Sequence, residues 1–426
     1  MTAFMLTTMV LLFALSVPIA IAILGASIGG AILFTSLNPL VVAQRLVATL
    51  DSFPLLAIPF FILAGNLMEA GGISRRLVEF AKSVVGGVQG GLACSCVLTC
   101  MIFASVSGSS IATTFAIGAI IIPAMIRHGY PVPFAAALQT TSAELGVIIP
   151  PSIPMILYGV SAEVSIGDLF VAGIGPGLLI GGALIIFVFA TCLWNGWGKA
   201  DGEGRMPLWP SLLQASWGLA MPVIVLGGIY RGIFTPTEAS VVAVIYALFV
   251  GVVIYRTITL SALIGVLRRS VISSSVIMFI IAAAGVFSFL ITRAGVPATI
   301  GAWLVEMFSG PVGFLLAVNA VLFLVGMFIE TSAAIIVLAP ILAPVAAQFG
   351  VNPVQFGLIM IVNLAMGMIT PPFGVNLFAA CQVAGISIDK IIGYLIPFVI
   401  VIIACLAVVT FVPEVSLFFL NVLSSR

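Results

Sequence analysis

The sequence predicts an all-α polytopic membrane protein made of two inverted-topology repeats, each with a re-entrant hairpin and a discontinuous helix. The composition and a motif that occurs twice predict this fold. Of the 426 residues, 62% are hydrophobic and 6% are charged, and the mean hydropathy is +1.37. Soluble domains carry about 25% charged residues. Apolar runs of about 20 residues, long enough to cross a bilayer core, recur along this chain.

The repeated motif is a pair of prolines that follows a glycine. Residues 146–151 read GVIIPP and residues 367–372 read GMITPP, which places the two copies 221 residues apart. The same separation pairs Pro123 with Pro344, Gly129 with Gly350 and Pro176 with Pro397. Helix-breaking segments at matching places in two halves indicate the binding site of a secondary transporter.

Two apolar segments, about 88–127 and 311–348, are interrupted near the middle by polar residues. The interruptions are SVSGSS at 105–110, and ETS at 330–332 after Gly326. Irregular backbone at membrane depth is tolerated only where protein or a water-filled cavity covers it, so we interpret both segments as re-entrant hairpins. Full spans are predicted at about 4–35, 52–69, 132–160, 167–194, 211–230, 237–255, 270–292, 353–380 and 391–412.

These segments divide into two repeats with a link between them. Residues 1–194 form the first repeat (hairpin about 88–127, broken helix about 132–160), and residues 237–426 form the second (hairpin about 311–348, broken helix about 353–380). Residues 195–236 are predicted to be a cytoplasmic loop and a linking span whose crossing inverts the second repeat. The loop is the hydrophilic stretch 195–210, with Lys199, Asp201, Glu203 and Arg205.

The positive charges fit an N-terminus in the cytoplasm and a C-terminus in the periplasm. Lys and Arg are concentrated in the cytoplasmic loops of membrane proteins. On this topology the outer segments contain Arg45, Arg231, Arg293 and Arg426. The inner segments contain more, namely Arg75, Arg76, Lys82, Arg127, Lys199, Arg205, Arg256, Arg268 and Arg269. The stretch with Arg75, Arg76 and Lys82 is predicted to be an amphipathic surface helix beside anionic lipid.

Five motifs, taken in order, carry a family resemblance. They are PFFILAGNLM at 59–68, SGSS at 107–110 followed by Pro123, Gly129 and Tyr130, IPPS at 149–152 followed by Tyr158 and Gly159, FTPTEA at 234–239, and TPPFG at 370–374. Together they resemble the large membrane subunit of tripartite ATP-independent periplasmic (TRAP) transporters, over essentially the whole chain.

The resemblance implies a fold of the ion-transporter superfamily, with a scaffold and a moving, elevator-type domain. It implies import of an organic acid, such as a C4-dicarboxylate, a sialic acid or another sugar acid, driven by Na+ across the bacterial inner (cytoplasmic) membrane. It also implies two partners, a small four-span membrane subunit and a periplasmic substrate-binding protein. Because no further span precedes residue 4, we expect the small subunit to be a separate polypeptide.

Sodium requires several oxygen ligands, and a broken helix supplies them because its last carbonyl groups have no N–H partner. Proline forces such a break, since it removes a donor and clashes with the preceding turn. We therefore expect one sodium site from carbonyl groups of Gly146 and Ile149 with hydroxyl groups of Ser105, Ser107, Ser109 or Ser110. The mirror site would use Gly326, Thr331, Gly367 and Thr370. The alternative is that the prolines only kink helices and the serines only allow close packing.

The substrate is expected between the two hairpin turns, where N-termini of half-helices favour a carboxylate. The candidate contacts are Ser109, Ser110, Thr113, Pro150, Pro151, Ser152, Glu330, Ser332, Pro371 and Asn376. No arginine lies at a predicted turn, so selection of a carboxylate by a salt bridge would belong to the periplasmic partner.

Two acidic residues are predicted near membrane depth, where a carboxylate is costly. Glu330 has either a role in transport or a role as the cap of a helix. Glu144 has no acidic counterpart in the second half, so we interpret it as structural. Cys94, Cys96 and Cys100 fit buried packing better than a metal site, because His128 is the only histidine.

Other functional classes are disfavoured. The chain has no nucleotide-binding Gly-x-x-x-x-Gly-Lys-Ser/Thr motif, no basic run for nucleic acid, and no histidine beside a candidate nucleophile, so it is not predicted to be an enzyme. The remaining alternative is a stand-alone sodium-coupled carboxylate transporter or antiporter of the same superfamily.

Overall fold

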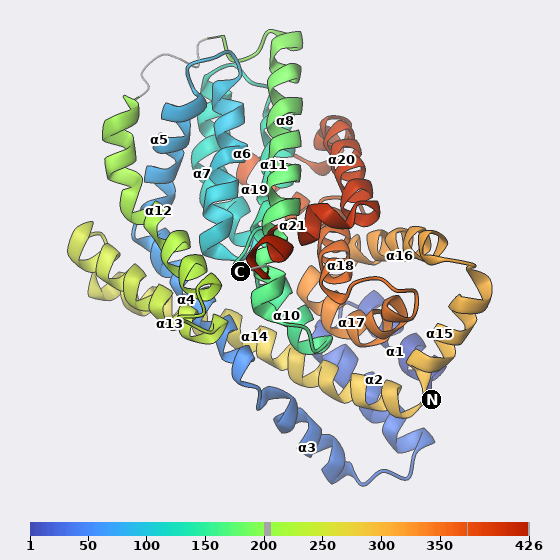
Figure 1. Cartoon of the computed structure of the whole chain (residues 1–426). Coiled ribbons are helices and arrows are strands. Elements are labelled where there is room, and N and C mark those ends of the chain that lie inside the picture. Colours follow the sequence, from blue (N-terminus) through green and yellow to red (C-terminus); the bar gives the residue numbers. More distant parts are fainter. Residues whose placement is uncertain (200–205, 373, 425–426) are drawn as a thin grey trace.

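The computed structural model describes residues 1–199, 206–372 and 374–424, and this part of the chain consists of helices and their connections (Figure 1). The all-α class is therefore confirmed. Asp201, Glu203 and Arg205 of the predicted loop, Phe373 of the last family motif and Arg426 lie outside the described residues.

The helices up to residue 199 contain the first predicted hairpin and the first broken helix. Their bounds are α1 (Thr2–Ala14), α2 (Ile19–Phe34), α3 (Pro39–Leu50), the 3-10 turn η1 (Phe53–Leu56), α4 (Ala57–Ala70), α5 (Ile73–Val85), α6 (Gly91–Ser107), α7 (Ser110–Arg127), α8 (Val132–Ala143), α9 (Leu145–Ile148), α10 (Ile153–Ser161) and α11 (Ile166–Asn195).

The helices after residue 206 contain the linking span and the second hairpin and broken helix. Their bounds are α12 (Leu208–Tyr230), α13 (Pro236–Leu248), the π-helical turn η2 (Phe249–Ile254), α14 (Leu260–Arg293), α15 (Val296–Met307), α16 (Pro311–Gly326), α17 (Thr331–Gln348), α18 (Pro353–Met368), α19 (Val375–Ala384), α20 (Ile388–Phe411) and α21 (Pro413–Ser424).

Eight helices in the described residues are long and apolar enough to cross a membrane, and the bent pair formed by α8–α9 and α10 raises the number to nine. The eight include η1–α4, α11, α12, α13–η2, α14 and α20, which match predicted spans, and also α7 and α17. The structure thus contains helix–turn–helix units where the hairpins are predicted, whereas their re-entrant arrangement and the inverted repeat remain predictions.

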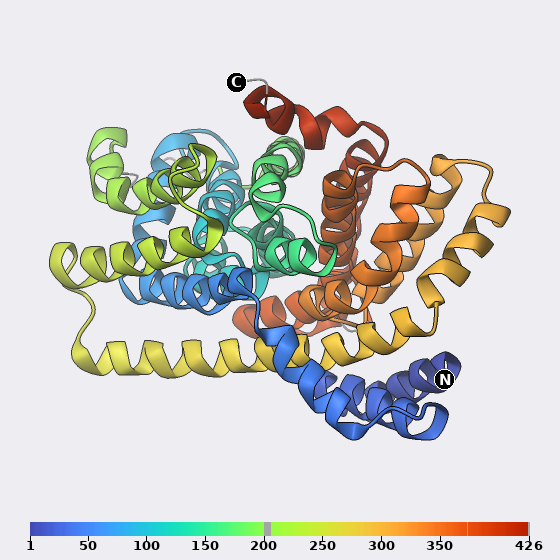
Figure 2. The ribbon, with the colours of Figure 1, turned by 60° about the horizontal axis from the view of Figure 1, so that its bottom comes forward.

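The predicted single span 4–35 is wrong, because the chain reverses direction inside it. Helices α1 and α2 pack against each other, with Phe4 beside Phe34 at 5.4 Å between ring centroids. Pro18 has no N–H to continue α1, and Ser16 before it adopts a positive φ of 59°. A continuous apolar run therefore forms two short antiparallel helices, which Figure 2 shows at the N-terminal edge.

Helix α14 is longer than predicted, and with 34 residues it is the longest helix among the described residues (Figure 2). It begins at Leu260 rather than near 270, so Arg268 and Arg269 lie within it. Its 34 residues extend about 51 Å at 1.5 Å per residue, more than the roughly 30 Å of a bilayer core. Such a helix must tilt or extend beyond the apolar layer, and it packs along α2, α3, α4 and α17.

The predicted amphipathic helix with Arg75, Arg76 and Lys82 is present as α5, but Arg76 makes its contacts within the protein. The Arg76 guanidinium lies 3.6 Å from the centroid of the Tyr255 ring and donates to the Gly72 carbonyl at 2.8 Å. Lys82 pairs with Glu79 at 3.2 Å. Arg75 is exposed, and its contact with anionic lipid remains a prediction.

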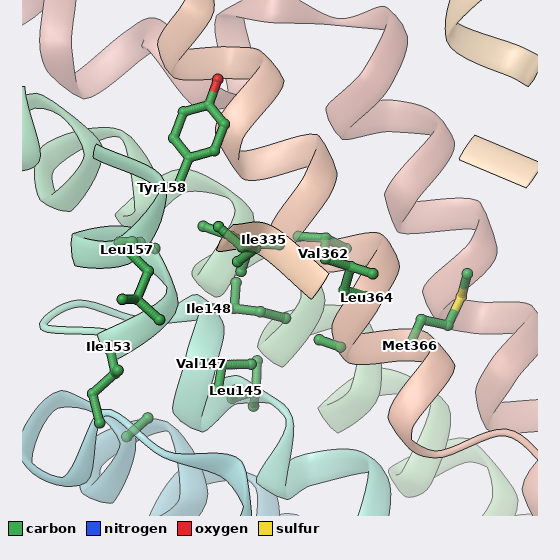
Figure 3. Packing of buried hydrophobic residues seen from close by; sticks show 14 of the residues in the cluster. Leu145, Val147, Ile148, Ile153, Leu157, Tyr158, Ile335, Val362, Leu364 and Met366 are labelled. Atoms are coloured by element: carbon green, nitrogen blue, oxygen red, sulfur yellow. The ribbon is translucent and has the colours of Figure 1, made fainter. Parts of the chain in front are cut away.

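The two halves meet in several places, and one of them is the contact of α9 and α10 of the first half with α17 and α18 of the second. Every residue of α18 from Val354 to Met368 is buried, as expected for a helix that is apolar all round. Figure 3 shows Ile148 beside Ile335 and Val362, so side chains from both halves share one core. The Tyr158 hydroxyl donates to the Pro353 carbonyl at 2.8 Å, which joins α10 to the start of α18.

Candidate functional site

The first proline break and the turn of the first hairpin are packed directly on each other. Gly108, with a positive φ of 60°, forms the turn between α6 and α7. Its carbonyl accepts a hydrogen bond from the N–H of Ile153 at 3.3 Å. A Cβ on Gly146 would lie 2.7 Å from the Ser109 carbonyl oxygen. Glycine is therefore required at position 146 for the two irregular segments to approach each other.

Hydroxyl groups surround this first contact. The Thr113 hydroxyl donates to the Ser109 carbonyl at 2.8 Å and lies 3.0 Å from the Ser107 hydroxyl. The Ser152 hydroxyl donates to the Val147 carbonyl at 2.6 Å, across the break. The Pro150–Pro151 peptide bond within the break is cis.

Ser105, a predicted ligand of the first sodium site, does not take part in the contact between the first turn and the first break. It lies in α6 before the turn and donates to the Ile102 carbonyl at 2.6 Å. Its hydroxyl thus bonds its own helix, and it is absent from the cavity that the neighbouring serines line.

The second break and the second turn repeat the arrangement with glycine on both sides. A Cβ on Gly367 would lie 2.3 Å from the carbonyl carbon of Gly326, and a Cβ on Gly326 would lie 2.7 Å from the Leu364 carbonyl oxygen. The Thr370 hydroxyl donates to the Met366 carbonyl at 2.9 Å. The Thr331 hydroxyl lies 3.0 Å from the Met368 sulfur. The Pro371–Pro372 peptide bond is also cis.

A cavity of about 540 Å³ brings the two turns together. Ser107, Ser109 and Ser110 line it from the first hairpin, and Glu330 and Ser332 line it from the second. The facing wall comes from α4 and α14. This volume lies in the range of small-ligand sites. The structure therefore joins predicted residues that are more than 200 positions apart in the chain.

Several predicted site residues are close to this cavity but do not line it. Pro150, Pro151, Ile149 and Gly146 lie behind the first turn, and Gly326, Thr331, Gly367, Thr370 and Pro371 form the second turn and break. Thr113, Ser152 and Asn376 are buried among neighbouring helices. These residues shape the contact between turn and break rather than the open surface of the cavity.

Glu330 is the cap of α17, so the capping alternative is present in the structure. Its carboxylate accepts hydrogen bonds from the N–H of Ala333 at 3.2 Å and from the Ser332 hydroxyl at 2.8 Å. A carboxylate at a helix N-terminus is favoured by the free N–H groups and by the helix dipole. Because Glu330 also lines the cavity, capping does not remove it from the candidate site.

The sequence interpretation missed the partnership between Glu144 and Asn376. The Asn376 side-chain amide donates to one Glu144 carboxylate oxygen and accepts from the Thr114 hydroxyl at 3.3 Å. Both residues are buried, and the second Glu144 oxygen has no hydrogen-bond partner among the described residues. Asn376 is thus a link between the halves, where we expected a substrate contact.

A sequence signal for this region exists in α8. The run Gln139, Thr140, Thr141, Ser142 and then Glu144 is polar, yet it lies inside an apolar segment and is fully buried. Polar groups at membrane depth need internal partners.

Gln139 also contacts two of the three cysteines that the sequence analysis considered, Cys96 and Cys100. Its amide donates to the Thr113 carbonyl at 3.2 Å, and its oxygen accepts from the Cys96 thiol at 3.1 Å. Over the described residues there is no group of three metal-ligating side chains. Cys94, Cys96 and Cys100 are all buried, as the packing interpretation expects.

Comparisons with known proteins agree on one family. The model of the "Tripartite ATP-independent periplasmic transporter, DctM component" matches residues 6–415. The chain is 44% identical to the C4-dicarboxylate TRAP transporter large permease protein DctM of Pseudomonas aeruginosa, over 88% of each chain. It is 35% identical to the sialic acid TRAP transporter large permease protein SiaM of Vibrio cholerae, over 96% of this chain and 95% of that one.

Two further matches concern architecture. The isethionate TRAP transporter permease protein DctMQ of Oleidesulfovibrio alaskensis is 41% identical over 96% of this chain and 65% of its own length. The solved structure of the YdaH transporter of Alcanivorax borkumensis superposes with a TM-score of 0.66 at 16% identity, covering 95% of this chain and 97% of the other. At that identity the likeness concerns the fold alone.

We predict that Asn376→Ala destabilises the protein by about 1–3 kcal/mol, because the buried Glu144 carboxylate loses its donor. The shift in melting temperature of the purified protein measures this. Asn195→Ala is the matched control, since the Asn195 amide donates to a carbonyl at an exposed helix end and its loss should cost no more than about 0.5 kcal/mol. In a Glu144→Gln background, Asn376→Ala should lower the melting temperature by a smaller amount, because the side chain at position 144 is then neutral. Equal shifts for Asn376→Ala and Asn195→Ala would contradict the interpretation.

Proposed function

Because this chain belongs to the DctM family, the DctM component of tripartite ATP-independent periplasmic transporters, we propose that it imports an organic acid together with sodium ions. The family is a transporter family, and its members work without ATP, as their name states. What supports the finer proposal is the paired geometry of the site: each hairpin turn packs on a proline break through a glycine contact, and one cavity joins the two turns.

The substrate we propose is an organic acid, because relatives are named for C4-dicarboxylates, sialic acid and 2,3-diketo-L-gulonate. Within the cavity, Ser109 and Ser110 are at the N-terminus of α7, and Ser332 is at the N-terminus of α17. Free N–H groups of a helix N-terminus favour a carboxylate. An acid between the two turns would therefore receive donors from both halves.

Sodium would be bound where each turn meets its break. The end of α9 and the end of α18 leave carbonyl groups without N–H partners. The hydroxyl groups of Thr370 and Thr331 donate away from their own oxygens, to Met366 and Met368. Their oxygen lone pairs stay available for a cation. The donors present are neutral oxygens, which fit a hard monovalent ion, and the ligand sets are those named from the sequence.

Membership of the family implies a small membrane subunit and a periplasmic binding protein as partners, which favours a subunit over a stand-alone transporter. The name DctMQ of one relative indicates that the small subunit is fused to the permease in that protein. We propose a small subunit of four spans as the membrane partner of this chain, and the bacterial inner membrane as the location.

The experiment that tests the function uses the large subunit with its small subunit and binding protein in proteoliposomes. We expect uptake of one acid from a panel of dicarboxylates and sugar acids only with an inward sodium gradient. The control replaces sodium by potassium at equal ionic strength. Equal uptake in potassium would refute sodium coupling, while uptake of none of the acids would refute the substrate class.

Ser107→Ala and Thr370→Ala test the two sodium sites separately. Loss of one neutral hydroxyl ligand should cost about 1 kcal/mol, roughly a fivefold increase in the sodium concentration for half-maximal transport. Ser216→Ala is the control, because the Ser216 hydroxyl in α12 bonds its own helix outside the cavity. If both variants keep the wild-type sodium dependence and fold normally, these hydroxyl groups are not ligands.

We propose an elevator motion, in which the turns and breaks move as one block. Separating them would expose unpaired backbone groups, at several kcal/mol each in the apolar layer. Helix α4, which packs on α13 and α14, would belong to the fixed scaffold. A Cβ on Gly65 of α4 would lie 3.3 Å from the Cα of Ser107 at the first turn.

A reversible disulfide between these two positions tests the motion. In a Gly65→Cys/Ser107→Cys variant, oxidation should stop transport and reduction should restore it, because the bond joins the block to the scaffold. Each single variant should be insensitive to the oxidant, since the six native cysteines are buried. Undiminished transport with the disulfide fully formed would exclude sliding at this contact.

A further inference from the structure

A second cavity, of about 460 Å³, lies away from the hairpin turns. One wall is formed by α3 and the C-terminal half of α14, and the other by the end of α10 and the middle of α17. Figure 1 shows α17 beside α14 in this region, and α10 packs against α17. None of the candidate sodium or substrate residues lines it.

Two arginines give this cavity its charge. Arg45 of α3 and Arg293 at the end of α14 both line it, and its lining contains no acidic residue. Among the described residues no carboxylate lies within 4 Å of either guanidinium, since the one ion pair found there joins Lys82 to Glu79. Two cationic groups that share a cavity without a counter-ion favour an anionic occupant.

The side chain of Arg45 is held by a contact with an aromatic ring. Its guanidinium lies 4.4 Å from the centroid of the Phe289 ring, a cation–π contact. Phe289 is one helical turn before Arg293 on α14, so the two residues lie on the same face of that helix.

The backbone of α3 is fixed one turn after Arg45. A Cβ on Gly285 would lie 2.1 Å from the Thr49 hydroxyl oxygen, so only glycine lets α3 approach α14 this closely. The Thr49 hydroxyl in turn donates to the Arg45 carbonyl at 2.7 Å. Gly285 and Thr49 thus act as positioning residues for Arg45.

The opposite wall connects the cavity to the candidate site. Ile336 and Pro340 line the cavity from α17, the helix that begins with Thr331 and Ser332 at the second turn. Ile336 is five residues after Thr331, about 8 Å along the helix. The sequence-based topology also places Arg45 and Arg293 on the periplasmic side, where an acid would arrive.

We propose that Arg45 and Arg293 form an anion-binding vestibule, which takes the carboxylate of the incoming organic acid before the acid reaches the hairpin turns. The inference rests on the proposed function. The planar guanidinium fork matches a carboxylate and binds it through two parallel hydrogen bonds. The volume suits a small acid.

The test measures initial rates of import against acid concentration in the complete assembly, for the acid that the panel identifies, in phosphatidylcholine liposomes. We expect Arg45→Gln/Arg293→Gln to raise the half-saturating acid concentration about tenfold while the maximal rate and the sodium dependence stay unchanged. Arg45→Lys/Arg293→Lys should recover part of the loss. Arg231→Gln, an exposed arginine on the predicted periplasmic side that lines neither cavity, is the matched control.

A second experiment measures anion binding to the large subunit alone, so that an effect of the variants on docking of the periplasmic binding protein is excluded. The photoreactive anion 4-benzoylbenzoate should label α17 near Ile336 in the large subunit alone. Labelling should fall in the double glutamine variant and in the presence of excess transported acid. An unchanged half-saturating concentration together with unchanged labelling would overturn the proposal.

The same experiment distinguishes an anionic lipid headgroup as occupant. If phosphatidylglycerol in the liposomes removes the labelling while excess acid does not, the site belongs to lipid and the vestibule is refuted. Failure of the wild-type assembly to import any acid would instead refute the proposed function. Both arginines are exposed, so the variants should fold, and a melting temperature equal to wild type confirms it.

Discussion

A backbone group freed by a helix break inside a membrane has no water to bond, so the protein itself must cover it. This constraint organises the structure around residues 146–153 and 367–375. At the first break, the turn at Gly108 supplies a carbonyl to the Ile153 N–H, and Ser152 bonds the Val147 carbonyl. Each hairpin turn therefore packs on a break and shields its freed backbone groups from lipid. The position of the candidate site follows from this packing.

Each turn can approach its break this closely because glycines, which have no side chain, lie at the contact. Gly146 faces the Ser109 carbonyl, and Gly326 and Gly367 face each other with no room for a Cβ on either. Close approach of backbones is what glycine permits at membrane depth. Sodium-sized oxygen clusters need this closeness as well, since carbonyl groups from two segments must point at one ion. The same residues thus satisfy the folding constraint and the proposed chemistry.

The halves are joined by contacts of a different kind. Tyr158 packs on Gly357 and donates to Pro353, and the Glu144–Asn376 bond runs from the break of one half to the start of α19 in the other. In a low-dielectric interior a buried polar pair is strong when satisfied and costly when broken. Such pairs would keep both turn–break units in one block, which agrees with the proposed elevator motion, while the arginine vestibule lies where that block meets α3 and α14.

The sequence by itself determined the membrane class, the helical content, both turn–break pairs and the polar residues that the two hairpin turns contribute to the cavity, namely Ser107, Ser109, Ser110, Glu330 and Ser332, because composition and helix-breaking residues are local signals. It failed at residues 4–35, where Pro18 interrupts an otherwise apolar run but does not by itself show that the chain reverses direction there, and at the start of α14. Only the tertiary structure decided that Asn376 bonds Glu144, that Glu330 shares a cavity with the serines of the first turn and that Arg45 shares a cavity with Arg293. Each of these depends on contacts between residues far apart in the chain, and the spacing of residues along one helix contains no information about which helix lies opposite.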